Sequence, residues 1–236
     1  MTTLSNFMPS SHRPASTLSR TPLGRCGPQA VSRIGLGCMG ISGMYGASDD
    51  APSIATIHAV LDAGINLLDA GDFYGFGHNE SLIGQALKGL RDDTPLSVKF
   101  GALRDPGGKF IGVDGRAAAV KNFLTYTLQR LGTDHIDIYC MARLDPSVPV
   151  EETSGTMAEL VQAGYARSIG LSEVGVETIK KAHAVPGCRS ADRVFAHQPQ
   201  TRGRNFSGLE RTRHRRYRIG RAVARAGGRL QTRIHW

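Results

Sequence analysis

Short apolar segments alternate with amphipathic helical segments along most of this chain. Each predicted strand and the helix after it form a unit of roughly 30 residues, the length typical of parallel βα units. The strands are apolar throughout, as expected of strands that are covered on both faces. The pattern predicts an α/β fold built on a parallel sheet. The predicted strands are 34–38, 65–68, 96–100, 136–141 and 166–171, and the predicted helices are 53–63, 80–90, 117–131, 151–163 and 176–184.

An open doubly wound sheet and a (β/α)8 barrel share this alternation. The loop after the first strand contains Gly37, Gly40 and Gly43 but no ordered G-x-G-x-x-G, the fingerprint of the open dinucleotide-binding sheet. Polar residues follow several of the strands, as in barrels whose chemistry lies at the carboxyl ends of the strands. The pattern therefore favours a (β/α)8 TIM-barrel type, incomplete, with about five or six βα units.

The beginning of the chain differs in composition from the middle. Residues 1–21 are rich in Ser, Thr and Pro and contain no acidic residue. This composition is typical of a disordered extension, and an organelle transit segment is the alternative. Turn residues between short apolar pieces predict a small hairpin at 22–33. Residues 22–185 are then the predicted partial barrel.

Positive charge is concentrated at the other end. Residues 184–236 hold thirteen arginines, no lysine, and only Asp192 and Glu210 as acids, whereas the whole chain has a net charge of +9. Few large apolar side chains occur here and no strand is evident, so residues 186–236 are predicted to be a disordered Arg-rich tail. The abrupt change from mixed Lys and Arg to Arg alone leads to the hypothesis that this tail is an out-of-frame product of a gene for a longer barrel.

Composition also bears on the compartment. The four cysteines, Cys26, Cys38, Cys140 and Cys188, form no C-x-x-C pair and no metal-ligand spacing. We therefore expect free thiols in a reducing compartment and a cytoplasmic location. No apolar run approaches the roughly 20 residues that a membrane-spanning helix needs, so no membrane association is expected.

Three reactive side chains lie at or just after the ends of two successive strands. Asp69 comes directly after the apolar run 65–68, Tyr74 lies in a loop bracketed by glycines, and Lys99 lies near the end of the next strand. Because neighbouring strands are about 5 Å apart, the Lys99 ammonium can lie between the other two groups. Asp69 would keep Lys99 charged, and Lys99 would lower the pKa of the phenol so that Tyr74 can donate a proton to a carbonyl oxygen. The alternative is three separate structural residues: a cap, a packed ring and a solvated lysine.

Four segments of the chain carry a recognisable pattern: NLLDAGDFYG (66–75), LSVKFG (96–101), LGTDHIDIYCMARLDP (131–146) and GYARSIGLSEV (164–174). In this order and at this spacing they resemble the aldo-keto reductases. The resemblance extends over residues 22–185, and it implies a TIM barrel that binds NADPH without a Rossmann fold and reduces an aldehyde or ketone to the alcohol. It also implies that Tyr74 is the proton donor and that Asp69 and Lys99 tune it.

The same resemblance implies a cofactor site. Gly37 and Met39, in the glycine-rich loop, would line the nicotinamide, and Tyr45 would form a wall of the substrate pocket; turn and packing roles are the alternative. Ser172 and Glu173 match the Ser-Asn pair with which the family holds the nicotinamide carboxamide. Glu in place of Asn is a departure from the family, although a carboxylate oxygen still accepts from an amide nitrogen.

Two other departures concern catalysis and cofactor binding. Ala142 occupies the position of the family's histidine, which orients the substrate carbonyl, and losing such a hydrogen bond costs on the order of 10²-fold in rate. His78 is the nearby candidate to replace it. The family's later groups, a Gln beneath the nicotinamide and Ser, Lys and Arg residues on the phosphates, are not recognisable in 186–236. The predicted function is a truncated NADPH-dependent aldo-keto reductase, and a catalytically inactive barrel fragment is the alternative.

Two expectations concern partners besides a small carbonyl substrate. A barrel without its last strands has two open sheet edges, which predicts self-association through an edge. The run HRRYR at 214–218 offers arginines for RNA or DNA phosphates. It lacks interleaved aromatic residues and any known binding module, so nucleic acid is the less favoured partner.

Overall fold

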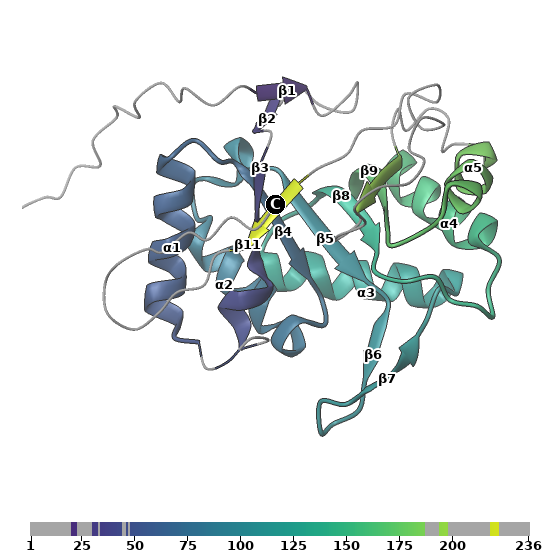
Figure 1. Cartoon of the computed structure of the whole chain (residues 1–236), viewed down its shortest axis with the longest axis horizontal. Helices are drawn as coiled ribbons and strands as arrows, with labels where there is room; N and C mark the ends of the chain where they lie inside the picture. The colour runs from purple at the N-terminus through teal and green to yellow at the C-terminus, as the bar shows by residue number, and fades with distance from the viewer. Residues whose placement is uncertain are drawn as a thin grey trace, which may run out of the picture.

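A parallel sheet forms the centre of the molecule. The computed structural model describes residues 20–22, 30–32, 34–43, 46, 48–186, 194–197 and 218–221. Within these residues the main sheet has seven strands in the order β10-β9-β8-β5-β4-β3-β11, and each neighbouring pair is parallel (Figure 1). The prediction of a parallel α/β fold is confirmed. Its five predicted strands are β3 (Ile34–Gly37), β4 (Leu67–Gly71), β5 (Leu96–Phe100), β8 (Ile136–Met141) and β9 (Ala166–Ser172).

Five helices follow these strands in turn, and successive helices pack against one another (Figure 1). The second ends earlier than predicted, because the chain turns at Leu87–Leu90, where Gly89 has a φ of +76°. The third ends at Gly132, whose left-handed backbone favours glycine. The helices are α1 (Asp50–Asp62), α2 (His78–Ala86), α3 (Ala117–Leu131), α4 (Val150–Gln162) and α5 (Val176–Ala184).

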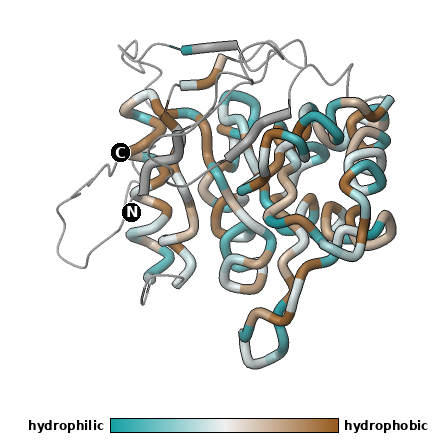
Figure 2. Tube along the Cα trace, turned by 45° about the vertical axis from the view of Figure 1, so that its right-hand side comes forward, coloured by the Kyte–Doolittle hydropathy of each residue, from teal (hydrophilic) through white to brown (hydrophobic). Residues whose placement is uncertain are grey.

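The two faces of the sheet differ in what they bury. Leu68 and Ala70 of β4 belong to the large apolar core that the strands share with the helices. Figure 2 shows hydrophobic and hydrophilic residues alternating along these helices, as expected of helices with one buried side. The opposite face holds a smaller cluster of Val31, Leu67, Ile138 and Cys140. Since successive strand residues point to opposite faces, Asp69 lies on this second face, which we call the inner face.

A short hairpin is tied to the start of β4. Its strands, β1 (Arg20–Pro22) and β2 (Ala30–Ser32), pair antiparallel. Asn66 accepts from the Ser32 backbone N–H at 2.8 Å and donates to the Ala30 carbonyl at 3.0 Å. The predicted hairpin is therefore present, although it begins slightly before the predicted domain start at residue 22.

The Arg-rich tail contributes two strands that the sequence analysis did not predict. β10 (Val194–His197) pairs with β9, and β11 (Arg218–Arg221) pairs with β3. The prediction of a tail without strands is wrong at these positions, because the composition of a long segment hides a short run such as VFAH, and because an open edge offers backbone partners to any extended segment. The predicted disorder of 1–21 and of most of 186–236 falls outside the described residues.

The sheet remains an arc. Within the described part of the chain β10 and β11 are its edges and do not pair with each other, as predicted for an incomplete barrel. A further hairpin, β6 (Ala102–Arg104) and β7 (Phe110–Val113), directly follows β5 and projects away from the body (Figure 1). None of the helices described is both long enough and apolar enough to cross a membrane.

Candidate active site

Asp69 and Lys99 form a buried ion pair on the inner face. They come from adjacent strands, and their residues are 4% and 6% exposed. The Lys99 ammonium donates to Asp69 Oδ1, and Ser97 Oγ donates to Asp69 Oδ2 at 3.0 Å. The register of β4 and β5 explains this, because Asp69 lies opposite Ser97, and Gly71 lies opposite Lys99. Each carboxylate oxygen therefore has its own donor, which fixes the side chain.

The surroundings of Lys99 keep it charged. Burial by itself lowers the pKa of Lys99, but the charge of Asp69, those of Tyr74 and Cys140 when ionised, and the hydrogen bond to Asp69 together raise that pKa above its ordinary value. Lys99 is therefore a fixed cation at neutral pH. The Tyr74 ring lies against Gly71, which is opposite Lys99 in the sheet, so the phenol and the ammonium are neighbours.

Tyr74 is held in place by its own turn. It begins η2 (Tyr74–Gly77) and is buried. A Cβ added at Gly71 would lie 3.1 Å from the Cε2 and Cζ atoms of Tyr74, so only glycine leaves the ring its present position. Phe73 packs edge-on against the ring, with centroids 4.7 Å apart. Backbone and neighbours thus direct Tyr74 to the end of β4, beside the ion pair.

Both ring nitrogens of His78 contact side chains outside the Asp69–Lys99 pair. Its Nδ1 lies 3.2 Å from Ser42 Oγ, and its Nε2 lies 2.8 Å from Asp50 Oδ1. Asn79 Nδ2 also donates to Ser42 Oγ, at 2.8 Å. These contacts hold η1 (Cys38–Ser42) against the start of α2. Because both ring nitrogens have partners, the structure does not support His78 as the replacement for the family's histidine.

The end of β8 has no polar side chain at the position of that histidine. Ala142 is 2% exposed, and its backbone N–H donates to the Phe100 carbonyl at 3.0 Å. The next residue, Arg143, donates from Nη1 to the Ala142 carbonyl at 2.8 Å and pairs through Nη2 with Glu173 Oε1 at 2.9 Å. One oxygen of the Glu173 carboxylate is therefore paired with arginine, and its other oxygen can still accept a hydrogen bond.

Ser172 differs from Glu173 in its hydrogen bonding. It ends β9, it is 1% exposed, and its hydroxyl has no hydrogen-bond partner among the described residues. An unpaired buried hydroxyl is costly. Ser172 is thus suited to hydrogen-bond a ligand at the carboxyl end of β9, two strands along from Lys99.

The first predicted cofactor residues lie beside the ion pair. Gly37 is opposite Asp69 in the register of β3 and β4, and Met39 is in η1. Burial, then the charge of Asp69, raises the pKa of the Cys38 thiol, while Lys99 opposes the rise. This coupling shows that η1 lies close to the pair. Tyr45 is outside the described residues.

Three site residues were missed by the sequence analysis. Ser97 could have been found, because it lies two residues before Lys99 and so shares its face of the strand. Gly71 gave no signal, since its role depends on the position of the Tyr74 ring. Asp72, which is 8% exposed, has its pKa raised to about 8, by burial first and by the Glu80 charge second, with Arg130 opposing.

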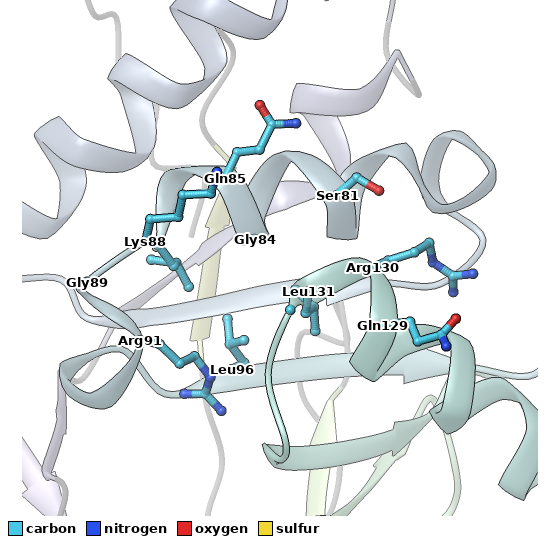
Figure 3. Close-up of a pocket in the computed structure, with 12 residues that line it drawn as sticks. Ser81, Gly84, Gln85, Lys88, Gly89, Arg91, Leu96, Gln129, Arg130 and Leu131 are labelled. Carbon is cyan, nitrogen blue, oxygen red and sulfur yellow. The ribbon is translucent and has the colours of Figure 1, made fainter.

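A groove of about 400 Å³ lies elsewhere, between α2 and the end of α3 (Figure 3). It includes Leu96, the first residue of β5, and so lies toward the amino-terminal edge of the sheet. Its arginines are already paired, Arg130 with Glu80 and Arg91 with Asp137. The groove contains none of Asp69, Tyr74 and Lys99, so it is separate from the candidate active site.

The fold and the site define a class: a parallel βα barrel with a buried Asp–Lys pair and a tyrosine at the carboxyl ends of adjacent strands. The sequence model of the Aldo/keto reductase family matches residues 33–202, and the chain belongs to that family. The match continues past the predicted barrel end at residue 185 and includes β10.

Curated relatives agree with this assignment. The chain is 37% identical over 166 residues to the aldo-keto reductase yakc [NADP(+)] of Schizosaccharomyces pombe, covering 70% of this chain and 49% of the relative. It is 43% identical over 158 residues to the aldo-keto reductase YhdN of Bacillus subtilis, covering 66% and 47%. The chain therefore spans about half the length of the curated relatives it matches.

Solved structures show the same fold. The glycerol dehydrogenase AKR11B4 of Gluconobacter oxydans is 30% identical with a TM-score of 0.65, over 73% of this chain and 53% of that one. The aldo-keto reductase AKR11C1 of Bacillus halodurans, in its holo form, is 31% identical with a TM-score of 0.64, over 77% and 58%. The barrel prediction is confirmed, and the structure describes part of that barrel.

Proposed function

We propose that this chain carries the active centre of an NADPH-dependent aldo-keto reductase. The chemistry that NADPH would supply, when bound, is a hydride for the carbonyl carbon of an aldehyde or ketone. Tyr74 donates the phenol proton to the carbonyl oxygen, so that the products are an alcohol and NADP⁺. The observation that carries the proposal is the buried Lys99 cation, held by Asp69 and electrostatically coupled to Tyr74.

The ion pair suits proton donation by Tyr74. Loss of the phenol proton leaves a phenolate, and a fixed cation nearby stabilises that negative charge in a site from which water is largely excluded. Asp69 prevents Lys99 from losing its own proton, and Ser97 keeps Asp69 oriented. The three groups act as one unit, in which Tyr74 is the catalytic acid and Asp69 and Lys99 tune it.

The residues present fit the nicotinamide end of the cofactor. The unpaired buried hydroxyl of Ser172 would bind the carboxamide, while Gly37 and Met39 would line the ring. Glu173, which pairs with Arg143 through Oε1, would offer its other carboxylate oxygen to the carboxamide nitrogen. Support for this cofactor comes from the NADP(+) in the name of the Schizosaccharomyces pombe relative and from a Klebsiella pneumoniae aldo/keto reductase described in complex with NADP and acetate, 27% identical with a TM-score of 0.59.

Ala142 limits the rate in this proposal. The Ala142 side chain has no donor for the substrate carbonyl, and one such donor is worth about 10²-fold in kcat. The reaction is therefore expected to be slow compared with that of a family member that has the histidine. A cytoplasmic location and self-association through the edges of the sheet belong to the same proposal.

The test measures NADPH oxidation by the purified chain with a panel of small aldehydes and ketones. Tyr74→Phe should lower kcat by at least about 10²-fold, because the acid is lost, and should leave NADPH binding unchanged in a fluorescence titration. Tyr126→Phe is the matched control, since Tyr126 is 52% exposed on α3, and it should retain full activity. Equal rates for Tyr74→Phe and the unmodified chain would remove Tyr74 from this role, and a chain that binds no NADPH would refute the reductase assignment.

A further inference from the structure

Phe76 adopts a backbone conformation that aromatic residues rarely accept. Its φ is +56° and its ψ is +42°, between Gly75 and Gly77, which also have positive φ. Within the described residues, Phe76 and Glu173 are the two non-glycine residues with positive φ. A bulky side chain in this left-handed region is strained, and such strain is often found at functional sites.

The Phe76 side chain is also largely exposed, at 64%. A glycine here would relieve the strain and would remove an apolar ring from water, so the free protein gains little from phenylalanine at this position. The neighbouring glycines show that the turn itself needs no side chain. The position therefore calls for an account outside the stability of the fold.

The ring rests on the β6–β7 hairpin. A Cβ added at Gly108 would lie 3.0 Å from Phe76 Cζ. Two backbone hydrogen bonds close the hairpin turn, since the Gly108 N–H donates to the Asp105 carbonyl at 2.9 Å and the Asp105 N–H donates to the Lys109 carbonyl at 3.0 Å. The ring thus bridges η2 and this hydrogen-bonded turn.

Both bridged segments belong to the candidate active site. Phe76 is two residues from Tyr74, so their Cα atoms are at most about 7 Å apart. The hairpin begins directly after β5, the strand of Lys99, and its base is closed by the Asp114 N–H donating to the Gly101 carbonyl at 2.9 Å. It projects from the carboxyl-terminal edge of the sheet (Figure 1). Its second strand includes Phe110 and Ile111, which are exposed.

We propose that Phe76, supported by the hairpin, is a specificity-determining residue that binds an aromatic or bulky apolar group attached to the substrate carbonyl. This inference rests on the proposed reductase function and adds a substrate class to it. Contact with an apolar substituent would remove the exposed ring from water and form an aromatic pair where the substituent is a phenyl group. Small or strongly polar carbonyl compounds would gain nothing from it.

The experiment compares methylglyoxal with phenylglyoxal, which share the reacting aldehyde and differ in a methyl or a phenyl group. Phe76→Ala in the full chain should lower kcat/KM for phenylglyoxal about tenfold and change that for methylglyoxal less than about twofold. Tyr165→Ala is the matched control, because Tyr165 is 49% exposed and directly precedes β9, at the amino-terminal ends of the strands and away from the candidate active site. It should change neither value.

A thermal melt separates this role from a structural one. Phe76→Gly should unfold at the same or a higher temperature than the unmodified chain, because the backbone strain is relieved, and should show the same selective loss with phenylglyoxal. If kcat/KM falls equally for both dicarbonyls, or falls for neither, the assignment of Phe76 is overturned while the reductase proposal stands.

A binding measurement keeps the two proposals distinct. Saturation-transfer NMR with acetophenone, and with acetone as its small counterpart, reports contact without turnover. If the chain reduces neither dicarbonyl but binds acetophenone in a manner that Phe76→Ala abolishes, the apolar site stands and the reductase proposal fails. If acetophenone binds equally well to Phe76→Ala, or does not bind, the apolar site is refuted.

Discussion

The buried pair of Asp69 and Lys99 allows a quantitative test of how the site is held. Asp69→Asn or Lys99→Met leaves the other charge in a place where the two side chains are only 6% and 7% exposed. Removing one member of a buried pair typically costs about 3–5 kcal/mol of unfolding free energy. The double variant orphans neither charge, so its cost should fall short of the sum of the single costs by about 2 kcal/mol or more.

The measurement is urea unfolding of the four proteins at pH 7, followed by circular dichroism. Lys121 and Glu159 provide the control cycle, because they form a 2.8 Å ion pair whose side chains are 53% and 63% exposed. The coupling energy of this exposed pair should be below about 1 kcal/mol. If the costs at Asp69 and Lys99 are additive, the pair does not hold the site together and the reasoning above fails.

The unmodified chain and the Asp69→Asn variant should differ in how their stability depends on pH. In the unmodified chain the pKa of Lys99 is raised above its ordinary value of about 10.4, so its contribution to stability is complete below that value and is lost only as the pH rises through the higher folded-state pKa. In Asp69→Asn the negative charge that raises the pKa of Lys99 is gone, while burial still lowers that pKa. The pKa of Lys99 should therefore fall. The unfolded state then binds more protons than the folded state, so the stability of this variant should rise between pH 7 and pH 9.5. A flat profile would contradict the assigned cause.

Three other substitutions test neighbouring parts of the site. Asp72→Asn should raise stability at pH 8 by about 1–3 kcal/mol and should remove a decline in urea midpoint between pH 4 and 8. The reason is that a carboxyl with its pKa raised to about 8 stays protonated in the folded state and opposes folding as the pH rises. An unchanged midpoint would exclude the ionisation of Asp72 as the cause. Gly71→Ala should displace the Tyr74 ring by a few tenths of an ångström and lower kcat by about tenfold or more with little change in NADPH binding, and full activity would show that the ring position is not critical. Ala142→His should raise kcat with small aldehydes by about 10²-fold, and no gain would mean that the end of β8 does not face the substrate carbonyl.

The central fold could be predicted from sequence because its signals are local and repeated. Each of the strands β3, β4, β5, β8 and β9 is a short apolar run followed by an amphipathic helix, and the parallel arrangement follows from that alternation. Asp69, Tyr74 and Lys99 could be placed together because the carboxyl ends of neighbouring parallel strands meet at one edge of the sheet. Their exact hydrogen bonds depend on register, which the sequence leaves open by a residue or more.

The remaining features depend on contacts that no local pattern encodes. β10 and β11 pair with existing edges through their backbones, so their side chains need not alternate. The β6–β7 hairpin lies in a segment whose sequence indicates only turns. The pairing of Glu173 with Arg143, and of His78 with Ser42 and Asp50, joins residues far apart in sequence or on separate loops. Each changes the role that a motif alone would assign to the residue.

The position of the ion pair within the sheet separates two requirements of the proposed reaction. β4 and β5, which carry Asp69 and Lys99, lie between β3 and β8 and are not edge strands of the described sheet. The proton donor is thus supported by strands and turns that are all present in the described residues. In the proposal, cofactor binding depends on Ser172 at the end of β9, which is one strand from the edge, and on phosphate contacts that the sequence does not reveal. Affinity for NADPH should therefore be the more sensitive of the two to changes in the edge strands, while the Asp69–Lys99 coupling energy should survive them.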